Sequence, residues 1–491
     1  MVGRVHGDLA ITGDDPIGIA RRPPRDLQIA SEQLSLVLRI DHVRKRTITL
    51  LLIVGSSLLN AQPPLPKPLL IRNVTVIDCA GHASQSGMAI LISNGRIAAL
   101  GPVSAMKAPA NADVVDAHGK YLIPGLWNMH VHLGAYANGK LAISAYLAQG
   151  ITGLRDMGSP LEDILQLRKE TDEGTILGPH LVVAGPIVQG PLPFKMPLFV
   201  SVKDPAEARQ TVDMLRTRGV DFIKVQDAIP HDIYAAVADE ARREHVPFVG
   251  HLPPTVLPEE ASDLGQHSIE HLGGRFWGVL IGASKRESEL HVEEVRMYRD
   301  ILAALERKEP PPSPSMRAAF TRAIVESYDS QKAATLVERF RKNDTWQCPT
   351  LVVLHTLWAD GETQYTPEDL SWAERLIRKD TELILMMNKA GVGLLAGTDL
   401  PASAKDGTIH DELLALVGAG LTPMQALETA TRKPAEFLGK RDSFGSVEIG
   451  KVADLLLLDA NPLDDIHNTR RISAVIVRGH MVAGQTTLTA P

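Results

Sequence analysis

Leu122-Ile-Pro-Gly-Leu-Trp-Asn-Met-His-Val-His-Leu133 is the stretch that decides the fold prediction for this chain. Its apolar residues predict a short β-strand just after Pro124-Gly125. Residues two apart on a strand point to the same face, so His130 and His132 should point toward one place. Imidazole is a favoured ligand of zinc and other borderline divalent metals. Two structural histidines at a strand end would look the same, so the rest of the chain must decide.

The composition places the chain among globular proteins. Its 491 residues can hold a barrel of about 250 residues and a smaller second domain. Hydrophobic residues make up 44% and charged residues 22%, and the formal net charge is −7. Because the sequence has no basic stripe, we expect no nucleic-acid partner. The expected partner is a small-molecule or short-peptide substrate, and a homo-oligomer is left open.

The first sixty residues differ from the rest. The basic segment 42–46 precedes the apolar run 49–59, and Asn60-Ala-Gln62 then restarts a polar chain. This order predicts a leader over 1–61 with a secretory signal peptide at 42–61, and therefore a periplasmic or secreted protein. The run is too short to span a membrane, so we expect no membrane span in the mature protein. We expect the true start near Val43; the alternative is a cytoplasmic protein with a partly apolar leader.

Both ends of the remaining chain have β-patterns. Residues 69–78 alternate between apolar and polar, and Ser93-Asn-Gly95 is a strong hairpin signal. Residues 455–458 and 472–477 are further strand candidates. We predict a small discontinuous β-sandwich domain built from both chain ends, from residues 67–123 and 439–486.

Residues 124–438 alternate between strand and helix patterns. Such an α/β alternation predicts a parallel (β/α)8 barrel of the TIM type. Helical spacing is clear at 205–218 and 233–244. The eight strand candidates are 127–133, 152–157, 180–188, 220–225, 246–251, 267–271, 348–354 and 392–399.

A long insert separates the sixth and seventh strand candidates. It covers residues 273–344, with helices expected at 287–307 and 315–341 around Pro310-Pro-Pro312. A connection of this length inside a compact domain is often functional. The insert is either a lid on the active face or an outer elaboration of the barrel.

The ends of the predicted strands carry side chains that can bind metals. Barrel enzymes place their chemistry at the C-terminal ends of the strands. One such residue would usually be structural, but six together indicate a metal centre. These candidates are His130, His132, Lys224, His251, His271 and Asp399.

Several motifs resemble a known superfamily. Pro124-Gly-Leu-Trp-Asn-Met-His-Val-His132 and Gly397-Thr-Asp399 resemble the amidohydrolase superfamily. Gly150-Ile-Thr-Gly-Leu-Arg-Asp156, Ser268-Ile-Glu-His271, Ala419-Gly-Leu-Thr-Pro423 and Gly450-Lys-Val-Ala-Asp454 resemble its imidazolonepropionase- and prolidase-like branch. The resemblance covers roughly residues 67–485.

The resemblance implies two divalent metal ions, with zinc as the default. His130, His132 and Asp399 would bind the buried ion, and His251 and His271 the exposed one. A hydroxide between the ions would attack the substrate carbonyl, which the exposed ion polarises. Asp399 would be the catalytic residue that takes the proton and passes it to the leaving nitrogen.

Lys224 would bridge the two ions. An ammonium group cannot bind a cation, but reaction with CO2 converts it into a carbamate whose two oxygens can. Imidazolonepropionase has one metal and lacks this lysine, so Lys224 argues against that particular activity. The His-x-Glu signature of related deaminases is absent, and a deaminase would have one metal and an unmodified lysine.

Three further residues are candidate substrate contacts. They are Arg155 at the end of the second strand, His355 after the seventh and His410 beyond the eighth. The alternative for Arg155 is a structural ion pair, and for His410 a hydrogen bond within the last loop.

The predicted function is metal-dependent hydrolysis of an amide-type C–N bond. Alternatives are an Xaa-Pro dipeptidase and a lactone or ester hydrolase, because the same hydroxide attacks any activated carbonyl. A non-catalytic binding relative would be expected to have lost ligands, yet all six positions are filled.

Overall fold

The computed structural model describes residues 67–135, 139–274, 277–309, 314–354, 366–404 and 407–484. The leader with its signal peptide and the side chain of His355 lie outside these ranges, so both stay predictions. Among the described residues, no helix is both long and apolar enough to cross a membrane.

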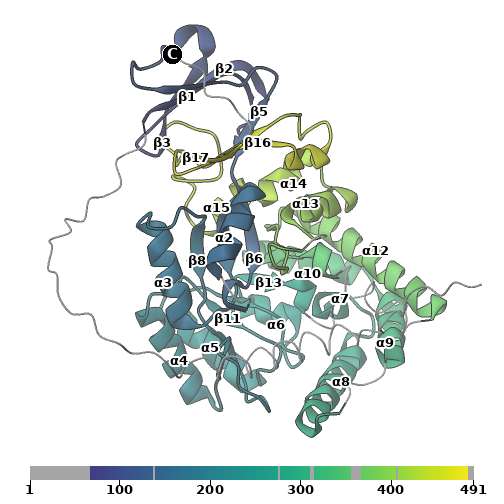
Figure 1. The fold of residues 1–491 in the computed structure, drawn as a ribbon. Helices are drawn as coiled ribbons and strands as arrows, with labels where there is room; N and C mark the ends of the chain where they lie inside the picture. Colours follow the sequence, from purple (N-terminus) through teal and green to yellow (C-terminus); the bar gives the residue numbers. More distant parts are fainter. Residues whose placement is uncertain are drawn as a thin grey trace, which may run out of the picture. The chain divides into compact units, whose positions relative to one another are not determined.

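Both ends of the described chain contribute to one eight-stranded sheet (Figure 1). Its strand order is β17-β16-β15-β5-β1-β2-β3, and β4 pairs with β1. The antiparallel pairing of Leu122 in β5 with Leu457 in β15 joins the two parts of the chain, as expected. The two-layered sandwich form stays a prediction. The strands are β1 (Leu69–Val76), β2 (Gln85–Ser93), β3 (Arg96–Pro102), β4 (Asp113–Asp116), β5 (Tyr121–Pro124), β15 (Leu455–Leu458), β16 (Ile472–Val477) and β17 (His480–Gly484).

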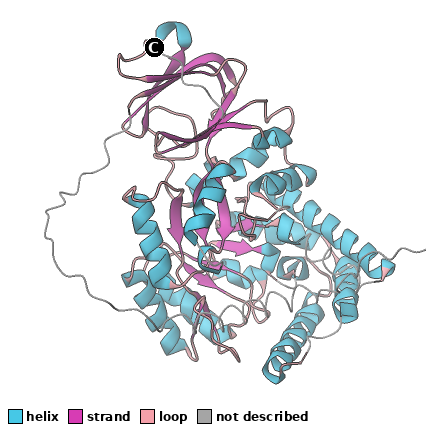
Figure 2. Cartoon of the chain, viewed as in Figure 1, coloured by secondary structure: helices cyan, strands magenta, loops and turns pink. Residues whose placement is uncertain are grey.

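The middle of the chain forms two parallel sheets with helices packed around them (Figure 2). One sheet has the order β6-β7-β8, and the other has the order β10-β9-β11-β12-β13-β14. This establishes the α/β class. The strands are β6 (Leu126–Val131), β7 (Ile151–Asp156), β8 (His180–Val183), β9 (Ile187–Gln189), β10 (Phe199–Ser201), β11 (Ile223–Val225), β12 (Phe248–Gly250), β13 (Ser268–Glu270) and β14 (Trp346–Cys348).

The eighth predicted strand, 392–399, is not a regular strand. Its only β-bridge among the described residues pairs Leu394 with Gln347 of β14. On its other side, the Met129 N–H of β6 donates to the Ala396 carbonyl oxygen at 2.9 Å. This segment therefore contacts the last strand of one sheet and the first strand of the other.

The seventh predicted strand is shorter than expected. The prediction of a strand over 348–354 is wrong, because β14 ends at Cys348 and residues 351–354 are helical. Pro349 has no N–H to donate to a strand ladder, and Thr350 has a left-handed φ of 48°.

The third predicted strand, 180–188, is two strands. Gly185 has a φ of 68° and precedes Pro186, so the chain turns between β8 and β9. The short strand β10 had no clear sequence signal.

The predicted helices over 205–218 and 233–244 are confirmed within two residues at their ends. Asp204 starts α4 by accepting a hydrogen bond from the Glu207 N–H at 2.8 Å. The helices outside the insert are α2 (Gly139–Ala148), α3 (Leu161–Asp172), α4 (Pro205–Thr217), α5 (His231–Arg243), α6 (Pro258–Asp263), α12 (Pro367–Ala390), α13 (Ile409–Gly418), α14 (Pro423–Thr429) and α15 (Arg432–Phe437).

The insert is helical, as expected, but it is divided differently. Its helices are α7 (Gly278–Gly282), α8 (Glu287–Arg307), α9 (Pro314–Ser327) and α10 (Ser330–Lys342). The single helix expected over 315–341 is wrong, because Asp329 caps a new helix by accepting from the N–H groups of Gln331 and Lys332. Its role as a lid or an outer elaboration stays open.

An apolar layer fills the space between the parallel strands. It includes Trp127 and Met129 of β6 and Trp346 of β14. A Cβ on Gly153 would lie 2.2 Å from the Trp127 ring, so only glycine fits there. His130 comes directly after this layer along β6. The candidate metal-binding residues therefore begin where the apolar layer ends.

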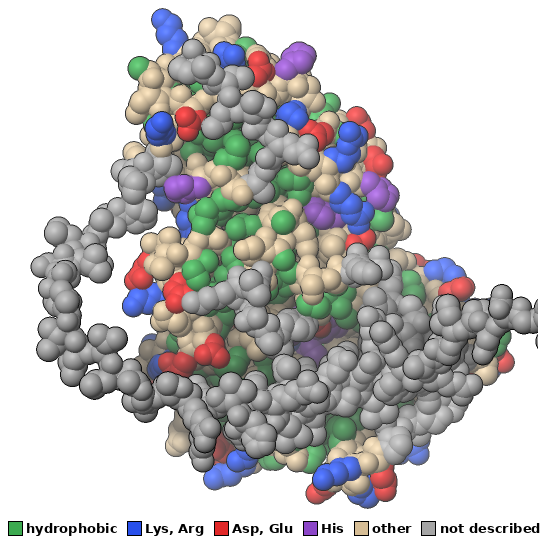
Figure 3. Space-filling model, viewed as in Figure 1, with side chains coloured by type: hydrophobic (Ala, Val, Ile, Leu, Met, Phe, Trp, Pro, Cys, Tyr) green, Lys and Arg blue, Asp and Glu red, His purple; other side chains and the backbone are tan. Residues whose placement is uncertain are grey.

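The surface carries charges of both signs. On the face in Figure 3, the blue basic and red acidic side chains of the described residues are interspersed. This distribution agrees with the mixed composition of the sequence.

Candidate metal centre

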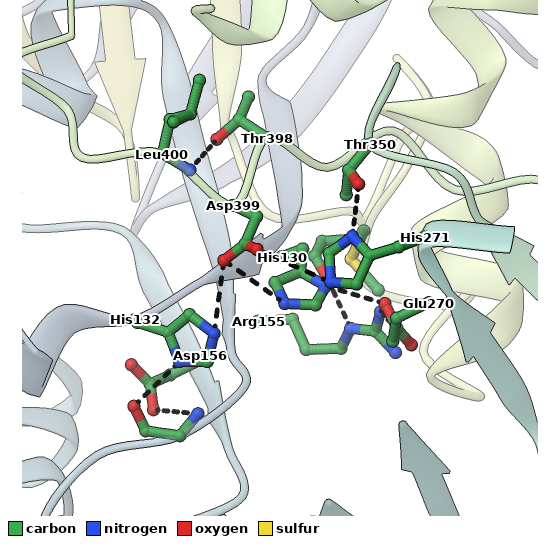
Figure 4. A network of polar contacts seen from close by, with 12 residues as sticks. His130, His132, Arg155, Asp156, Glu270, His271, Thr350, Thr398, Asp399 and Leu400 are labelled. Atoms are coloured by element: carbon green, nitrogen blue, oxygen red, sulfur yellow. Dashed lines mark hydrogen bonds and ion pairs between the residues drawn. The ribbon is translucent and has the colours of Figure 1, made fainter. Parts of the chain in front are cut away.

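Two histidines and one aspartate converge at the end of β6 (Figure 4). Oδ1 of Asp399 lies 3.6 Å from Nε2 of His130 and 3.3 Å from Nε2 of His132. Asp399 has a left-handed φ of 52°, and its N–H donates to the His130 carbonyl oxygen at 2.9 Å. The backbone bond between these two segments therefore holds the carboxylate beside both rings.

A second pair of histidines lies beside the first. Oδ2 of Asp399 is 3.5 Å from Nε2 of His271. The ring centroids of His271 and His251 are 4.9 Å apart, and those of His271 and His130 are 4.6 Å apart. The carboxylate of Asp399 therefore faces ligand candidates of both proposed metal positions.

Lys224 lies in the middle of β11 and is completely buried. Among the described residues, its Nζ has no hydrogen-bond partner. Burial lowers the pKa of Lys224 to about 8, although the nearby carboxylates of Glu270 and Asp399 oppose this. A buried amine with a lowered pKa is more often neutral and can then react with an electrophile such as CO2.

Each of the four histidines has a partner on its Nδ1 side. These partners orient each ring so that Nε2 is the atom left to bind a metal. They are Glu270 Oε2 for His130 (2.9 Å), the Gly158 carbonyl oxygen for His132 (3.1 Å), Asp227 Oδ1 for His251 (2.7 Å) and Thr350 Oγ1 for His271 (2.5 Å).

The electrostatics of the site favour neutral rings at His130 and His271 around an ionised carboxylate, whereas Asp399 raises the pKa of His132 against the effect of its burial. Burial lowers the pKa of His271 to about 3 and also lowers the pKa of His130. Burial alone would raise the pKa of Asp399, but the neighbouring His130 and His132 rings hold it well below its usual value. Neutral imidazoles and a carboxylate are the protonation states that metal binding requires.

The donor set fits a zinc ion. Two donors about 2.0–2.2 Å from a tetrahedral zinc lie about 3.4 Å apart. The Asp399 oxygen has nearly this separation from the Nε2 atoms of His130 and His132, at 3.6 and 3.3 Å. Nε2 of His130 is also buried and lacks a hydrogen-bond partner among the described residues. An unpaired buried nitrogen is costly, and a bound cation would supply its partner.

Arg155 does not face the space between the ligands. It is completely buried, and its Nη2 lies 3.0 and 2.8 Å from the two carboxylate oxygens of Glu270 (Figure 4). Its Nε donates to the Met129 carbonyl oxygen at 2.5 Å. The structure therefore shows the structural ion pair that the sequence analysis weighed against a substrate contact for Arg155. The partner is Glu270, which in turn holds His130.

We expect Arg155→Met to destabilise the fold strongly. The substitution leaves the Glu270 carboxylate buried without its cation, which costs about 3–5 kcal/mol. Arg296→Met breaks an exposed pair with Glu293 and should cost less than about 1 kcal/mol. Chemical unfolding of both variants checks this, and equal losses would contradict a special role for the buried pair.

His410 also lies outside the ligand cluster. It is in α13, only 5% exposed, and its Nδ1 lies 3.0 Å from the Thr469 hydroxyl oxygen in the short helix Ile466–Arg470. Burial lowers its pKa to about 4, so the ring is neutral. The structure thus assigns His410 to the hydrogen bond that the sequence left as the alternative, rather than to a substrate contact.

The sequence interpretation did not find the residues that orient the ligands. Glu270 directly precedes His271, and Asp227 follows Lys224 by three residues. The sequence did contain a signal for Glu270 and Asp227, because each is an acidic residue close to a strand-end ligand candidate. The role of Thr350 had no signal, because it depends on the turn after β14.

The parallel strands end at a cluster of histidines and a carboxylate whose side chains could bind metal ions. A model of the amidohydrolase family matches residues 121–307 and 310–482. The chain therefore belongs to the amidohydrolase family, whose members are generally metal-dependent.

The similar proteins act on different substrates. A deacetylase from Agrobacterium fabrum is 39% identical over 105 residues, 20% of this chain and 25% of the deacetylase. An adenine deaminase from Ruegeria pomeroyi is 22% identical over 85% of this chain and 57% of the deaminase. The chain thus spans about a quarter and just over half of the lengths of these relatives.

Solved structures share the fold over most of the chain. An Xaa-Pro dipeptidase with bound methionine has a TM-score of 0.63 at 20% identity, covering 85% of this chain and 100% of the dipeptidase. The Aspergillus niger ochratoxinase has a TM-score of 0.61 at 20% identity, covering 85% and 96%. At these identities, the similarity establishes the fold alone.

Proposed function

We propose that this amidohydrolase is a two-metal enzyme that hydrolyses an amide-type C–N bond in a small molecule or short peptide. The observation that carries the proposal is the convergence of His130, His132 and His271 on Asp399, with His251 beside His271 and the buried Lys224 within electrostatic reach of the Asp399 carboxylate. We infer a closed (β/α)8 barrel with a β-sandwich built from both chain ends, as in the family.

In this proposal, zinc is the metal. His130, His132 and Asp399 hold the buried ion, and His251 and His271 hold the exposed ion. Lys224, as a carbamate formed with CO2, would supply oxygen donors to hold the two ions. When bound, the two ions supply an activated water and polarise the scissile carbonyl.

The chain's own residues hold and move the proton. The Asp399 carboxylate lies between both histidine pairs, so it can accept a proton from the attacking water and pass it to the leaving nitrogen. The acceptors on the Nδ1 atoms favour the tautomer in which Nε2 of each neutral histidine carries no hydrogen. The apolar layer that includes Trp127 and Met129 borders the site on the side of β6 that precedes His130, and it excludes bulk water there.

Two other activities are second candidates. The prolidase-like sequence motifs, such as Ser268-Ile-Glu-His271, make dipeptides candidate substrates. The adenine deaminase relative supports a deaminase, which would need only one metal. Lactone or ester hydrolysis follows from the same chemistry, whereas a non-catalytic binding protein would not need to keep all six donors.

The test measures metal content and hydrolysis together. The chain from Gln62 onward is produced with zinc and bicarbonate, and its metals are counted. It is then assayed on dipeptides including Xaa-Pro, N-acyl amino acids, adenine and simple lactones. Two metals per chain with amine release from an amide support the proposal. One metal with ammonia release from adenine would replace it with a deaminase.

We further propose that the protein is exported through the predicted signal peptide. The basic, apolar and polar order of residues 42–62 supports this. N-terminal sequencing of the native protein should find a mature start at Gln62. An intact leader would contradict export.

A further inference from the structure

Thr350 contacts one of the proposed ligands from outside the centre. Its hydroxyl oxygen lies 2.5 Å from Nδ1 of His271, and the hydroxyl donates to the Pro349 carbonyl oxygen at 2.8 Å. A threonine hydroxyl has one hydrogen, so its oxygen must accept the Nδ1 hydrogen of His271. Thr350 therefore selects the tautomer in which Nε2 of His271 can bind a metal (Figure 4).

This contact depends on an unfavourable backbone conformation. Thr350 has a φ of 48°, in the left-handed region that β-branched residues rarely adopt. Such a conformation costs about 1–3 kcal/mol and persists only when the surroundings enforce it. Residues 351–354 form a helical turn directly after it, so the start of that turn must be held in place.

Glu412 holds the start of this turn. It lies in α13, far along the chain, and is completely buried. One carboxylate oxygen accepts from the Leu351 N–H and the other from the Val352 N–H, both at 3.0 Å. N–H groups in a first helical turn have no partner within the helix, so both need an outside acceptor. Burial raises the pKa of Glu412 to about 8, and only these two N–H donors oppose it.

The neighbouring acid has a different role. Asp411 belongs to the capping box with Thr408 at the start of α13 and pairs with Arg470. Glu412 instead points inward, to the segment after β14, which the sequence analysis predicted to be part of the seventh strand. Its contacts therefore connect α13 to the turn that holds His271 directly after β13.

We propose that Glu412 is a positioning residue of the metal centre. It fixes the Leu351–Val352 backbone and thereby holds Thr350 in the conformation that orients His271. This inference rests on the proposed function, because it takes His271 as a metal ligand.

The test is a Co2+ titration of the metal-free full chain in bicarbonate buffer, followed by visible absorption. The titration is run above pH 8, where Glu412 is ionised and both of its oxygens accept. Glutamine offers one acceptor oxygen and one donor group, so Glu412→Gln cannot serve both N–H groups equally. We expect it to bind the more weakly held ion about 10-fold less tightly, with an altered Co2+ spectrum. Glu240→Gln is the matched control, because Glu240 is a buried glutamate on α5 that pairs with Arg209 and Arg243 away from the site.

A second pair of variants tests the same connection at its other end. Thr350→Val removes the acceptor for His271 and should weaken binding about 10- to 100-fold, whereas Thr350→Ser keeps the hydroxyl and should restore most of the affinity. If Glu412→Gln does not fold, the two Thr350 variants provide the test. Equal Co2+ affinities of Thr350→Val and Thr350→Ser would overturn the inference.

Thermal unfolding of the metal-free variants separates positioning from general stability. A Glu412→Gln protein that melts earlier but keeps the wild-type affinity and spectrum would overturn the inference while leaving the proposed function intact. A wild-type chain that binds fewer than two ions would overturn the proposed function, and this inference with it.

Discussion

Lys224→Met should lose about a thousandfold in kcat/KM and bind fewer than two metal ions per chain. Methionine keeps most of the length of the side chain but cannot form a carbamate, so the bridge between the two metal positions is lost. A metal ion supplies several kcal/mol of transition-state stabilisation, and each 1.4 kcal/mol corresponds to about tenfold in rate. Metal analysis and steady-state kinetics with the best substrate from the panel check this.

The stability of the metal-free protein separates this role from a structural one. Nζ of Lys224 is buried without a hydrogen-bond partner among the described residues, so its removal should stabilise the metal-free fold by about 1–3 kcal/mol. We therefore expect lower activity together with a higher melting temperature. Wild-type activity and two metals in Lys224→Met would show that the lysine bridge is wrong.

Asp399→Asn should lower kcat by about 10²–10⁴-fold, because the amide can neither accept nor pass on the proton. Asparagine is the right substitution here. Asp399 has a φ of 52°, and asparagine tolerates this left-handed conformation better than alanine does. The variant should therefore fold, and the loss should reflect chemistry and metal binding rather than backbone strain.

The matched control for Asp399 is Asp380→Asn in α12. Asp380 is also buried, and burial raises its pKa well above the usual value, which favours the neutral carboxyl group that an amide resembles. We expect Asp380→Asn to keep the wild-type kcat. A comparable loss of kcat in both variants would mean that any buried acid matters and that Asp399 has no special role in proton transfer.

The sequence determined the class of the protein and the candidate ligands. The two-residue spacing of His130 and His132 places both at the end of β6, because a strand repeats every second residue. Lys224, His251 and His271 could be found because each lies in or just after a short apolar strand. The sheet shared by both chain ends was also readable, since its strands have clear alternation and a hairpin turn at Asn94-Gly95.

Only the tertiary structure decided how these ligands are oriented. Glu270, Asp227 and Thr350 hold the Nδ1 atoms of three histidines, and these contacts bring together residues from different strands and turns. Local pattern contains no information about such pairs. For the same reason, the sequence left the role of Arg155 open, because its ion pair joins β7 to β13.

The ends of the strands also depend on both local sequence pattern and tertiary contacts. Apolar periodicity indicates that a segment is buried, but it does not distinguish a strand from the helical turn that follows Pro349. The left-handed residues His271, Thr350 and Asp399 depart from strand geometry where the candidate ligands gather, because contacts between distant segments enforce conformations that local preference disfavours. The sequence by itself thus specified which residues can bind metal. The packing of distant segments decided which atom of each residue faces the centre.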